Sequence, residues 1–384
     1  MIYLDHHATT PLCESARHIL TAHAQADSLG NPSSIHRAGR GARSMIEQTR
    51  RALANAVGVS VRELVFTSGG TEALHFCVRA CATGLSRVFV DAGAHPALVA
   101  AIKRQIPPSV KVATLPRNHN LSINFQELAE QVGGTSGLVL IAASWVQHET
   151  GMLLDTEAMG RFVDAHPRVV LLLDAIQALG KTPVDVHSTR ASAVAFSGHK
   201  IGGLSGCGAA WVRADTAPVV LLDGGGQERG LRAGTENLLG IATFGAALIE
   251  LPQRLNAQAE IGRRRDQIES CLLATAGVIA TPFGLHRVAT ACHVAVRDLP
   301  GEELVAALDL EGVFVSSGPA CTSGRGGASS SMLALFPGER WRARGALRVS
   351  LGPEVSDDDV SRARDTIMRV LPRVLATRVT LSAE

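Results

Sequence analysis

The sequence has no block of lysine and arginine residues, and its formal net charge is only +2 over 384 residues. This balance gives no electrostatic argument for direct binding to nucleic acid or to a membrane surface. No apolar stretch approaches the roughly 18 residues that a membrane-spanning helix requires. The N-terminal MIYLDHHATTP also lacks the basic start and the apolar run of a signal peptide. We therefore expect a soluble, cytoplasmic protein.

Paired cysteines of the kinds that bind zinc or form a disulfide framework are missing as well. The seven cysteines are scattered along the chain, with no C-x-x-C spacing. Cys77 and Cys81 lie one helical turn apart, which would suit a ligand pair. The segment around them, TEALHFCVRACATG, is apolar at helical spacing, so buried packing is the favoured interpretation.

What the chain does contain is a globular composition, 46% hydrophobic and 19% charged. From about residue 63 to 212, short β-branched runs alternate with helical stretches. The predicted strands are ELVFT, RVFVD, VKVATL, GLVLIA, VVLLLD, AVAFS and GAAWV, and the predicted helices include Thr71–Ala82, Pro96–Gln105 and Phe125–Gln131. This alternation predicts an α/β fold whose mostly parallel sheet is flanked by helices on both faces.

The pattern changes after the glycine-rich DGGGQERG. A long helical region at about 236–274 precedes strands near 288–296 and 312–316, the strand ALRVSLG, and a final helix near 356–376. These elements predict a smaller α+β domain. We expect a large domain of residues 14–250 and a small domain of residues 1–13 and 251–384.

Three segments of the large domain carry side chains that suit one chemistry. Lys200 follows the strand in AVAFSGHKIGG, and Asp174 ends the apolar strand VVLLLD, at the edge where open α/β sheets bind ligands. In ELVFTSGGTEALHF, a glycine turn with Gly70 and Thr71 opens a helix and offers backbone N–H groups to a phosphate. A lone lysine here is more often a solvated loop charge. Together, the phosphate cradle, the acid and the amine are what an enzyme supplies to pyridoxal phosphate.

Motifs dispersed over nearly the whole chain resemble those of the cysteine desulfurases, which belong to the class V aminotransferase group with the fold type I architecture. GGGQERGLRAGTEN and SSGPACTSG are the most specific of them. The others are YLDHHATTP, GNPSSIHRAG, FTSGGTEA, DAIQALGK, SGHKIGG and LRVSLG.

The resemblance implies that the large domain binds pyridoxal 5'-phosphate. Lys200 would form the Schiff base and shuttle protons, Asp174 would pair with the ring nitrogen, and Gln177 would hydrogen-bond the phenolic oxygen. The phosphate would be held by Gly70, Thr71, Ser197 and His199.

Further roles follow from the same resemblance. His95 would stack on the cofactor ring and Arg348 would clamp the substrate carboxylate, a task that suits a bidentate donor. Thr235 would reach the phosphate bound in the other subunit, which implies a homodimer. Without the resemblance, His95 is an ordinary residue before a helix, Arg348 a strand charge and Thr235 a helix cap.

The small domain would carry the nucleophile, Cys321, in the glycine- and serine-rich SSGPACTSGRGG. In the related enzymes this thiolate takes sulfur from L-cysteine as a persulfide, releases L-alanine and passes the sulfur to an acceptor protein. We expect His95 or substrate groups to deprotonate the thiol, because a free thiol is mostly protonated near neutrality. The long segment between Cys321 and Arg348 is similar to that of desulfurases that serve scaffold or carrier proteins. No closed metal site is expected, and Cys321 could serve at most as a transient iron ligand.

The chain departs from the family pattern in two places. WVQHETG has Gln147 and His148 where the family has two asparagines, and TEALH has His75 where asparagine is common. His148 would donate to the phenolic oxygen and touch the substrate carboxylate, and both changes add an imidazole near the cofactor. The alternatives left open are a selenocysteine lyase or aminotransferase on the same scaffold, or a pyridoxal-phosphate-binding sulfur-relay partner with weak activity.

Overall fold

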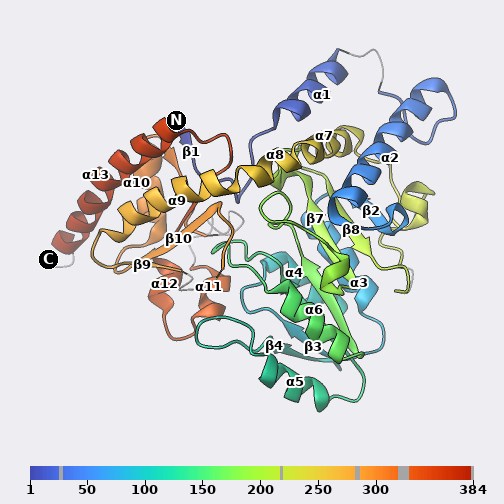
Figure 1. Cartoon of the computed structure of the whole chain (residues 1–384), viewed down its shortest axis with the longest axis horizontal. Helices are drawn as coiled ribbons and strands as arrows, with labels where there is room; N and C mark the ends of the chain where they lie inside the picture. The colour runs from blue at the N-terminus through green and yellow to red at the C-terminus, as the bar shows by residue number, and fades with distance from the viewer. Residues whose placement is uncertain (26–28, 217–218, 282–285, 319–327, 382–384) are drawn as a thin grey trace.

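A seven-stranded sheet forms the centre of the large part of the molecule (Figure 1). The structure is a computed structural model that describes residues 1–25, 29–216, 219–281, 286–318 and 328–381. The strand order is β2-β8-β7-β6-β5-β3-β4. In chain order the strands are β2 (Leu64–Thr67), β3 (Leu85–Val90), β4 (Lys111–Thr114), β5 (Leu138–Ser144), β6 (Val169–Asp174), β7 (Ala193–Ser197) and β8 (Gly208–Val212). Every pair is parallel except those of β8, which runs antiparallel to both β2 and β7.

Helices cover both faces of this sheet, as the alternating pattern predicts. On one face α3 (Gly70–Cys81) and α4 (Pro96–Gln105) bury residues such as Leu74 and Leu98 against the strands. On the other face lie α2 (Arg37–Val57), α5 (Phe125–Gly133), α6 (Thr156–Ala165) and α7 (Leu238–Ile249). The predicted α/β fold class is therefore confirmed.

A smaller unit lies beside the sheet, at the left of Figure 1. Its antiparallel sheet has the order β12-β10-β9, and the N-terminal β1 pairs with β11 in a parallel ribbon. The strands are β1 (Ile2–Tyr3), β9 (Val278–Ala280), β10 (Ala291–Val296), β11 (Val313–Phe314) and β12 (Ala346–Ser350), and the main helices are α9 (Gln258–Leu273), α10 (Gly301–Leu310) and α13 (Asp357–Leu381). Leu4 shares this unit's apolar core with Leu308 and Leu347. This shared core supports our proposal that residues 1–13 and 251–384 form the small domain.

The region 236–274 is not one continuous helix. It divides into α7, α8 (Leu251–Asn256) and α9, with Pro252 in the first turn of α8, where proline is tolerated. The structure also contains α1 (Glu14–Ala24), α11 (Ser330–Leu335) and α12 (Arg340–Arg344), which the sequence pattern did not predict. In the part of the chain that the structure describes, none of the helices combines the length and apolar character needed to cross a bilayer.

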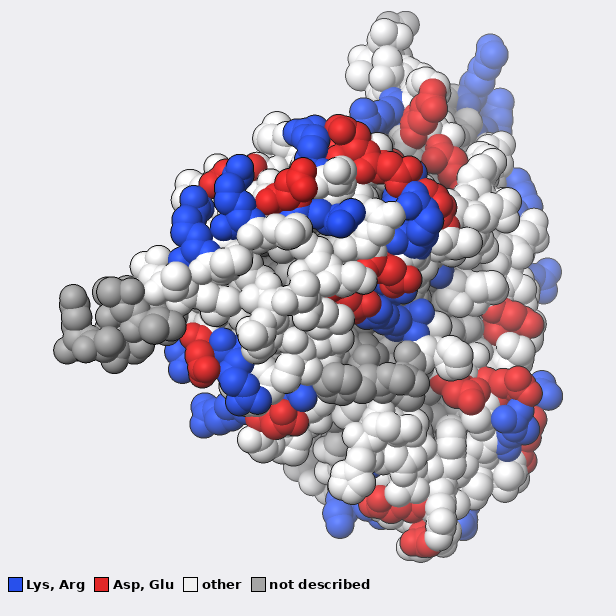
Figure 2. All heavy atoms as spheres, turned by 60° about the vertical axis from the view of Figure 1, so that its left-hand side comes forward, with Lys and Arg blue, Asp and Glu red and all other residues white. Residues whose placement is uncertain are grey.

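Charges on the small domain are mixed rather than separated by sign (Figure 2). Nε of Arg264 in α9 lies 3.2 Å from Oδ1 of Asp357, and Arg369 and Arg373 of α13 both form ion pairs with Glu311. This local pairing agrees with the balanced composition, since a basic patch for a polyanion requires cations that are not neutralised by adjacent carboxylates.

Candidate active site

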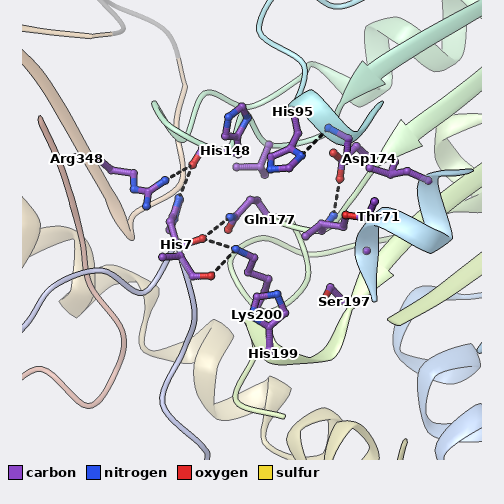
Figure 3. A pocket seen from close by; sticks show the side chains of 16 residues that line it. His7, Thr71, His95, His148, Asp174, Gln177, Ser197, His199, Lys200 and Arg348 are labelled. Atoms are coloured by element: carbon purple, nitrogen blue, oxygen red, sulfur yellow. Dashed lines mark hydrogen bonds between the residues drawn. The ribbon is translucent and has the colours of Figure 1, made fainter. Parts of the chain in front are cut away.

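A cavity of about 240 Å³ lies at the carboxyl ends of β6 and β7, beside the start of α3 (Figure 3). This is the edge at which open α/β sheets bind ligands. With the exception of Thr235, every site residue that the sequence predicts and the structure describes lines the cavity. The lining consists of His7, Ala8, Gly70, Thr71, Leu74, His95, Ala97, Val146, His148, Asp174, Ile176, Gln177, Ser197, His199, Lys200 and Arg348.

One end of the cavity has the character of an anion site. Gly70 and Thr71 form the first turn of α3, whose N-terminal N–H groups favour negative charge. A Cβ on Gly70 would lie 2.4 Å from Cδ1 of Ile176, so a larger residue here would have to displace that side chain. Ser197 is 1% exposed, and its hydroxyl has no hydrogen-bond partner among the described residues. A buried, unpaired hydroxyl at a helix N-terminus suits a phosphate oxygen.

Asp174 lies beside Thr71 in the cavity, at the end of β6 (Figure 3). Its Oδ1 accepts a hydrogen bond from the N–H of Ile176 at 3.0 Å. Burial raises the pKa of Asp174 to about 6, despite that hydrogen bond and the nearby cations. A buried carboxylate of this kind is stabilised by a cationic hydrogen-bond donor, such as a protonated ring nitrogen.

Lys200 extends into the cavity and donates to the backbone oxygens of His7 at 2.5 Å and Ala8 at 2.8 Å. Gln177 donates from Nε2 to the same His7 oxygen, and its Oε1 accepts from Nζ of Lys181 at 2.9 Å. The hydrogen bond from Lys181 fixes the orientation of the Gln177 amide. Burial also lowers the pKa of Lys181 well below its ordinary value.

His7 and Lys181 are functional candidates that the sequence reasoning missed. The ring of His7 is buried, with Nε2 2.9 Å from Oγ1 of Thr290. Both residues belong to motifs that carry the family resemblance, YLDHHATTP and DAIQALGK, and this membership was the available signal.

Arg348 lies on β12 and closes the cavity from the small domain. Its Nη2 pairs with Asp5 at 2.7 Å and its Nη1 donates to the backbone oxygen of His148 at 3.2 Å. The side chain is 2% exposed, and its Nε has no partner among the described residues. A carboxylate ligand would share this guanidinium with Asp5.

The two departures from the family pattern occupy different environments. His148 lines the cavity, and its ring meets that of His95 edge-on, with centroids 4.9 Å apart. His75 instead packs its Nδ1 3.2 Å from Nε2 of Gln105, at the end of α4, and is not part of the cavity lining. The expectation that both imidazoles lie at the cofactor site is wrong for His75, because that position of α3 faces α4.

The remaining predicted residues are not among the described residues that line the cavity. Thr235 is exposed, and its predicted contact with the other subunit stays a prediction. Cys321 lies outside the described residues. Cys77 and Cys81 are 0% and 4% exposed, which confirms the packing interpretation. Within the described ranges, no group of three or more His, Cys, Asp or Glu side chains could hold a metal ion.

Comparison with known proteins identifies the family. Residues 2–363 match the family described as Aminotransferase class-V. The chain belongs to that family. Class-V aminotransferases use pyridoxal phosphate, and the cavity described above contains groups suited to its phosphate and its ring nitrogen.

The most similar relatives of this class-V aminotransferase include cysteine desulfurases. It is 32% identical to the IscS-like cysteine desulfurase of Mycobacterium tuberculosis, over 98% of this chain and 96% of that protein. It is 30% identical to the cysteine desulfurase of Enterobacter agglomerans, over 99% and 94%. The X-ray structure of the NifS-like protein from Rickettsia africae matches with a TM-score of 0.86 at 26% identity, over 97% of this chain and 99% of that chain. The resemblance drawn from the motifs is confirmed.

Proposed function

We propose that this protein is a cysteine desulfurase that binds pyridoxal 5'-phosphate, removes sulfur from L-cysteine and releases L-alanine. The observation that carries the proposal is the convergence on one cavity of Lys200, Asp174 and the Ser197 hydroxyl, which has no hydrogen-bond partner in the described part of the chain. Relatives named as cysteine desulfurases, at about 30% identity over nearly the full chain, support it.

The residues present fit this cofactor. The start of α3, with Gly70 and Thr71, would hold the phosphate together with Ser197 and His199, and Asp174 would pair with the ring nitrogen. When bound there, pyridoxal phosphate supplies the electron sink that stabilises negative charge at Cα of the substrate.

The chain's own groups supply binding, proton transfer and the nucleophile. Arg348 binds the substrate carboxylate, and the Lys200 amine moves the proton at Cα. The Cys321 thiolate then takes the substrate sulfur: an S–S bond forms on Cys321, the C–S bond breaks, and Cβ gains a proton to give alanine. The persulfide sulfur passes to an acceptor protein, for iron–sulfur cluster assembly or another thiolation.

The assembly that we propose is a cytoplasmic homodimer. Thr235 is exposed in the single chain, in a segment that follows the glycine-rich motif. In the dimer, Thr235 would complete the phosphate site of the partner subunit. A Thr235→Ala variant that keeps its dimer but loads less cofactor would agree with that role.

The test is alanine release from L-cysteine by cofactor-loaded protein, with a reductant present to remove persulfide sulfur. We expect turnover by the wild type and none by Cys321→Ala. Cys271→Ala is the matched control, because Cys271 is partly exposed and lies on α9, away from the cavity. We expect it to behave as the wild type.

Two other outcomes would contradict the proposal. Turnover that persists in Cys321→Ala would remove the thiol from the chemistry and favour a lyase or an aminotransferase on the same scaffold. Cofactor loading with no alanine release from any variant would favour a sulfur-relay partner instead.

A further inference from the structure

Lys181 is a buried amine that the proposed chemistry does not use. The residue is 7% exposed and lies outside the cavity lining. Burial, followed by the charges of Lys200, Arg254 and Arg348, lowers the pKa of its amine well below the ordinary value. These three charges are all positive, so they oppose the burial of an ammonium group at this point. The position therefore suits a hydrogen-bond donor better than a charge.

The chain turns after β6 in a way that brings Lys181 back to Gln177. Within residues 175–182, backbone N–H groups bond to oxygens three or four positions earlier. Turns of this kind place side chains four residues apart on the same side. Gly180 lies in the left-handed region at φ +73°, and a Cβ there would lie 3.0 Å from Cγ2 of Ile201. The local backbone thus sets the lysine against the Gln177 amide.

The Gln177 amide is held at both ends. Its Nε2 donates to the backbone oxygen of His7 at 2.8 Å, and a carbonyl oxygen can only accept, so Nε2 faces His7. Its Oε1 therefore faces Lys181, whose Nζ donates to it at 2.9 Å. The two ends of an amide have nearly the same shape, so such partners decide which end faces a ligand.

One N–H of the Gln177 amide is left for a ligand in the cavity. Gln177 lines the cavity (Figure 3), and Nε2 has two N–H groups, one of which the structure assigns to His7. The family resemblance places the phenolic oxygen of the cofactor at this residue. A donor to that oxygen stabilises its negative charge, so the proton associated with it is lost at a lower pH.

We propose that Lys181 is a positioning residue that keeps this second N–H of Gln177 available to the phenolic oxygen, and that it thereby lowers the pH at which the bound cofactor loses its proton. The inference rests on the proposed function, because it requires pyridoxal phosphate in the cavity. Lys181 lies outside the lining, so it acts through the amide. Without the lysine, Oε1 of Gln177 loses its donor and the amide loses one of the two contacts that hold it.

Other charged and titratable groups surround Lys181 and also affect the titration of a bound cofactor. They are the same in every variant below except at the substituted residue, so differences between variants report on Lys181 and Gln177. The groups are His6, His7, His199, Lys200, Arg254 and Arg348.

The experiment is a pH titration of the cofactor absorbance in the loaded, full-length protein, from neutral to alkaline pH. Gln177→Leu removes the amide and should raise the midpoint by about one pH unit, as for loss of one hydrogen bond to a charged oxygen. Lys181→Met should raise the midpoint too, by no more than Gln177→Leu does. Methionine is unbranched like lysine and suits a buried position, but it has no N–H to donate.

The double variant decides whether Lys181 acts through Gln177. In the Gln177→Leu background, Lys181→Met should give no further rise. A rise of the same size in both backgrounds would refute the positioning role, because it would come from the charge of Lys181 itself. An unchanged midpoint in Lys181→Met alone would also refute it, since a merely structural lysine affects stability without moving the midpoint.

Two more variants test the hydrogen bond itself. Lys103→Met makes the same replacement at an exposed lysine of α4, and it should keep the wild-type midpoint. Lys181→Gln retains an uncharged N–H donor on a shorter side chain, and it should bring the midpoint back toward that of the wild type. If Lys181→Gln and Lys181→Met gave the same raised midpoint, the side chain at this position would not act as a donor.

The titration requires bound cofactor but no desulfuration, so this inference and the proposed function can fail separately. The expected midpoints without alanine release from L-cysteine would refute the desulfurase proposal and leave the role of Lys181 standing. Alanine release together with an unchanged midpoint in Lys181→Met would refute this inference alone. Failure of the wild type to load pyridoxal phosphate would refute both.

Discussion

His293 gives a quantitative prediction about how pH changes the stability of the fold. The residue lies on β10, opposite Arg348 of β12, and is 0% exposed. Neither of its ring nitrogens has a hydrogen-bond partner among the described residues. Burial lowers the pKa of His293 to about 4; the charge of Glu149 opposes this shift, and that of Arg348 adds to it.

The sign of the effect follows from where the proton binds. Below pH 6.5 the His293 imidazole of the unfolded chain binds a proton. In the folded chain the same imidazole binds a proton only near pH 4. The free energy of unfolding therefore falls as the pH drops through this window. At pH 5 the loss due to His293 alone is about 2 kcal/mol relative to pH 7.5.

The assay is urea unfolding of wild type and His293→Leu at pH 7.5 and pH 5. Leucine is close to histidine in size and does not titrate, so the drop between the two pH values should be smaller by about 2 kcal/mol in the variant. The exposed His18, changed to leucine, controls for the loss of a histidine as such. An equal drop in wild type and His293→Leu would refute the reasoning.

Two further predictions concern single contacts. Ser197→Ala removes a buried hydroxyl that has no partner among the described residues. The free energy of unfolding of the cofactor-free protein, measured in urea, should therefore rise by about 1 kcal/mol, while cofactor titration should show roughly tenfold weaker binding. A lower free energy of unfolding together with unchanged cofactor binding would contradict the phosphate role. Glu228→Ala removes the carboxylate that accepts hydrogen bonds from Nη1 and Nη2 of Arg50, both at 2.7 Å, and from the N–H of Phe66. The buried Arg50 then keeps only Glu47 and the backbone oxygen of Leu64 as hydrogen-bond partners among the described residues, so the loss should be about 3 kcal/mol in the same assay, and a loss below 1 kcal/mol would contradict it.

Much of the cofactor end of the site could be predicted from the sequence because its residues are tied to strand ends. Asp174 and Ser197 terminate β6 and β7, and Gly70 opens α3, so the parallel sheet brings them to one edge. His7 contacts Lys200 across a separation of 193 residues, whereas Lys181 contacts Gln177 only four residues away. A contact between distant segments has no local pattern, which is why the sequence reasoning missed His7.

The same distinction explains the fold. The apolar strands β6, β7 and β8 are found at their predicted bounds, because their runs are continuous and buried on both faces. α2 was missed although eight of its residues are buried, because its apolar positions are separated by many arginines. The division of 236–274 into three helices depends on the local backbone at Glu250 and Ala257, which a helical pattern does not reveal.

The charge balance around Glu149 bears on the stability prediction for His293. Arg348 is already paired with Asp5, and the ion pair that the structure gives for Glu149 is with His148. His293 also lies near Glu149, but burial keeps its pKa near 4, so it stays neutral at the pH of the reaction. His293 therefore does not pair with Glu149 near neutral pH, and the stability lost on acidification comes from the proton that the imidazole of the unfolded chain binds.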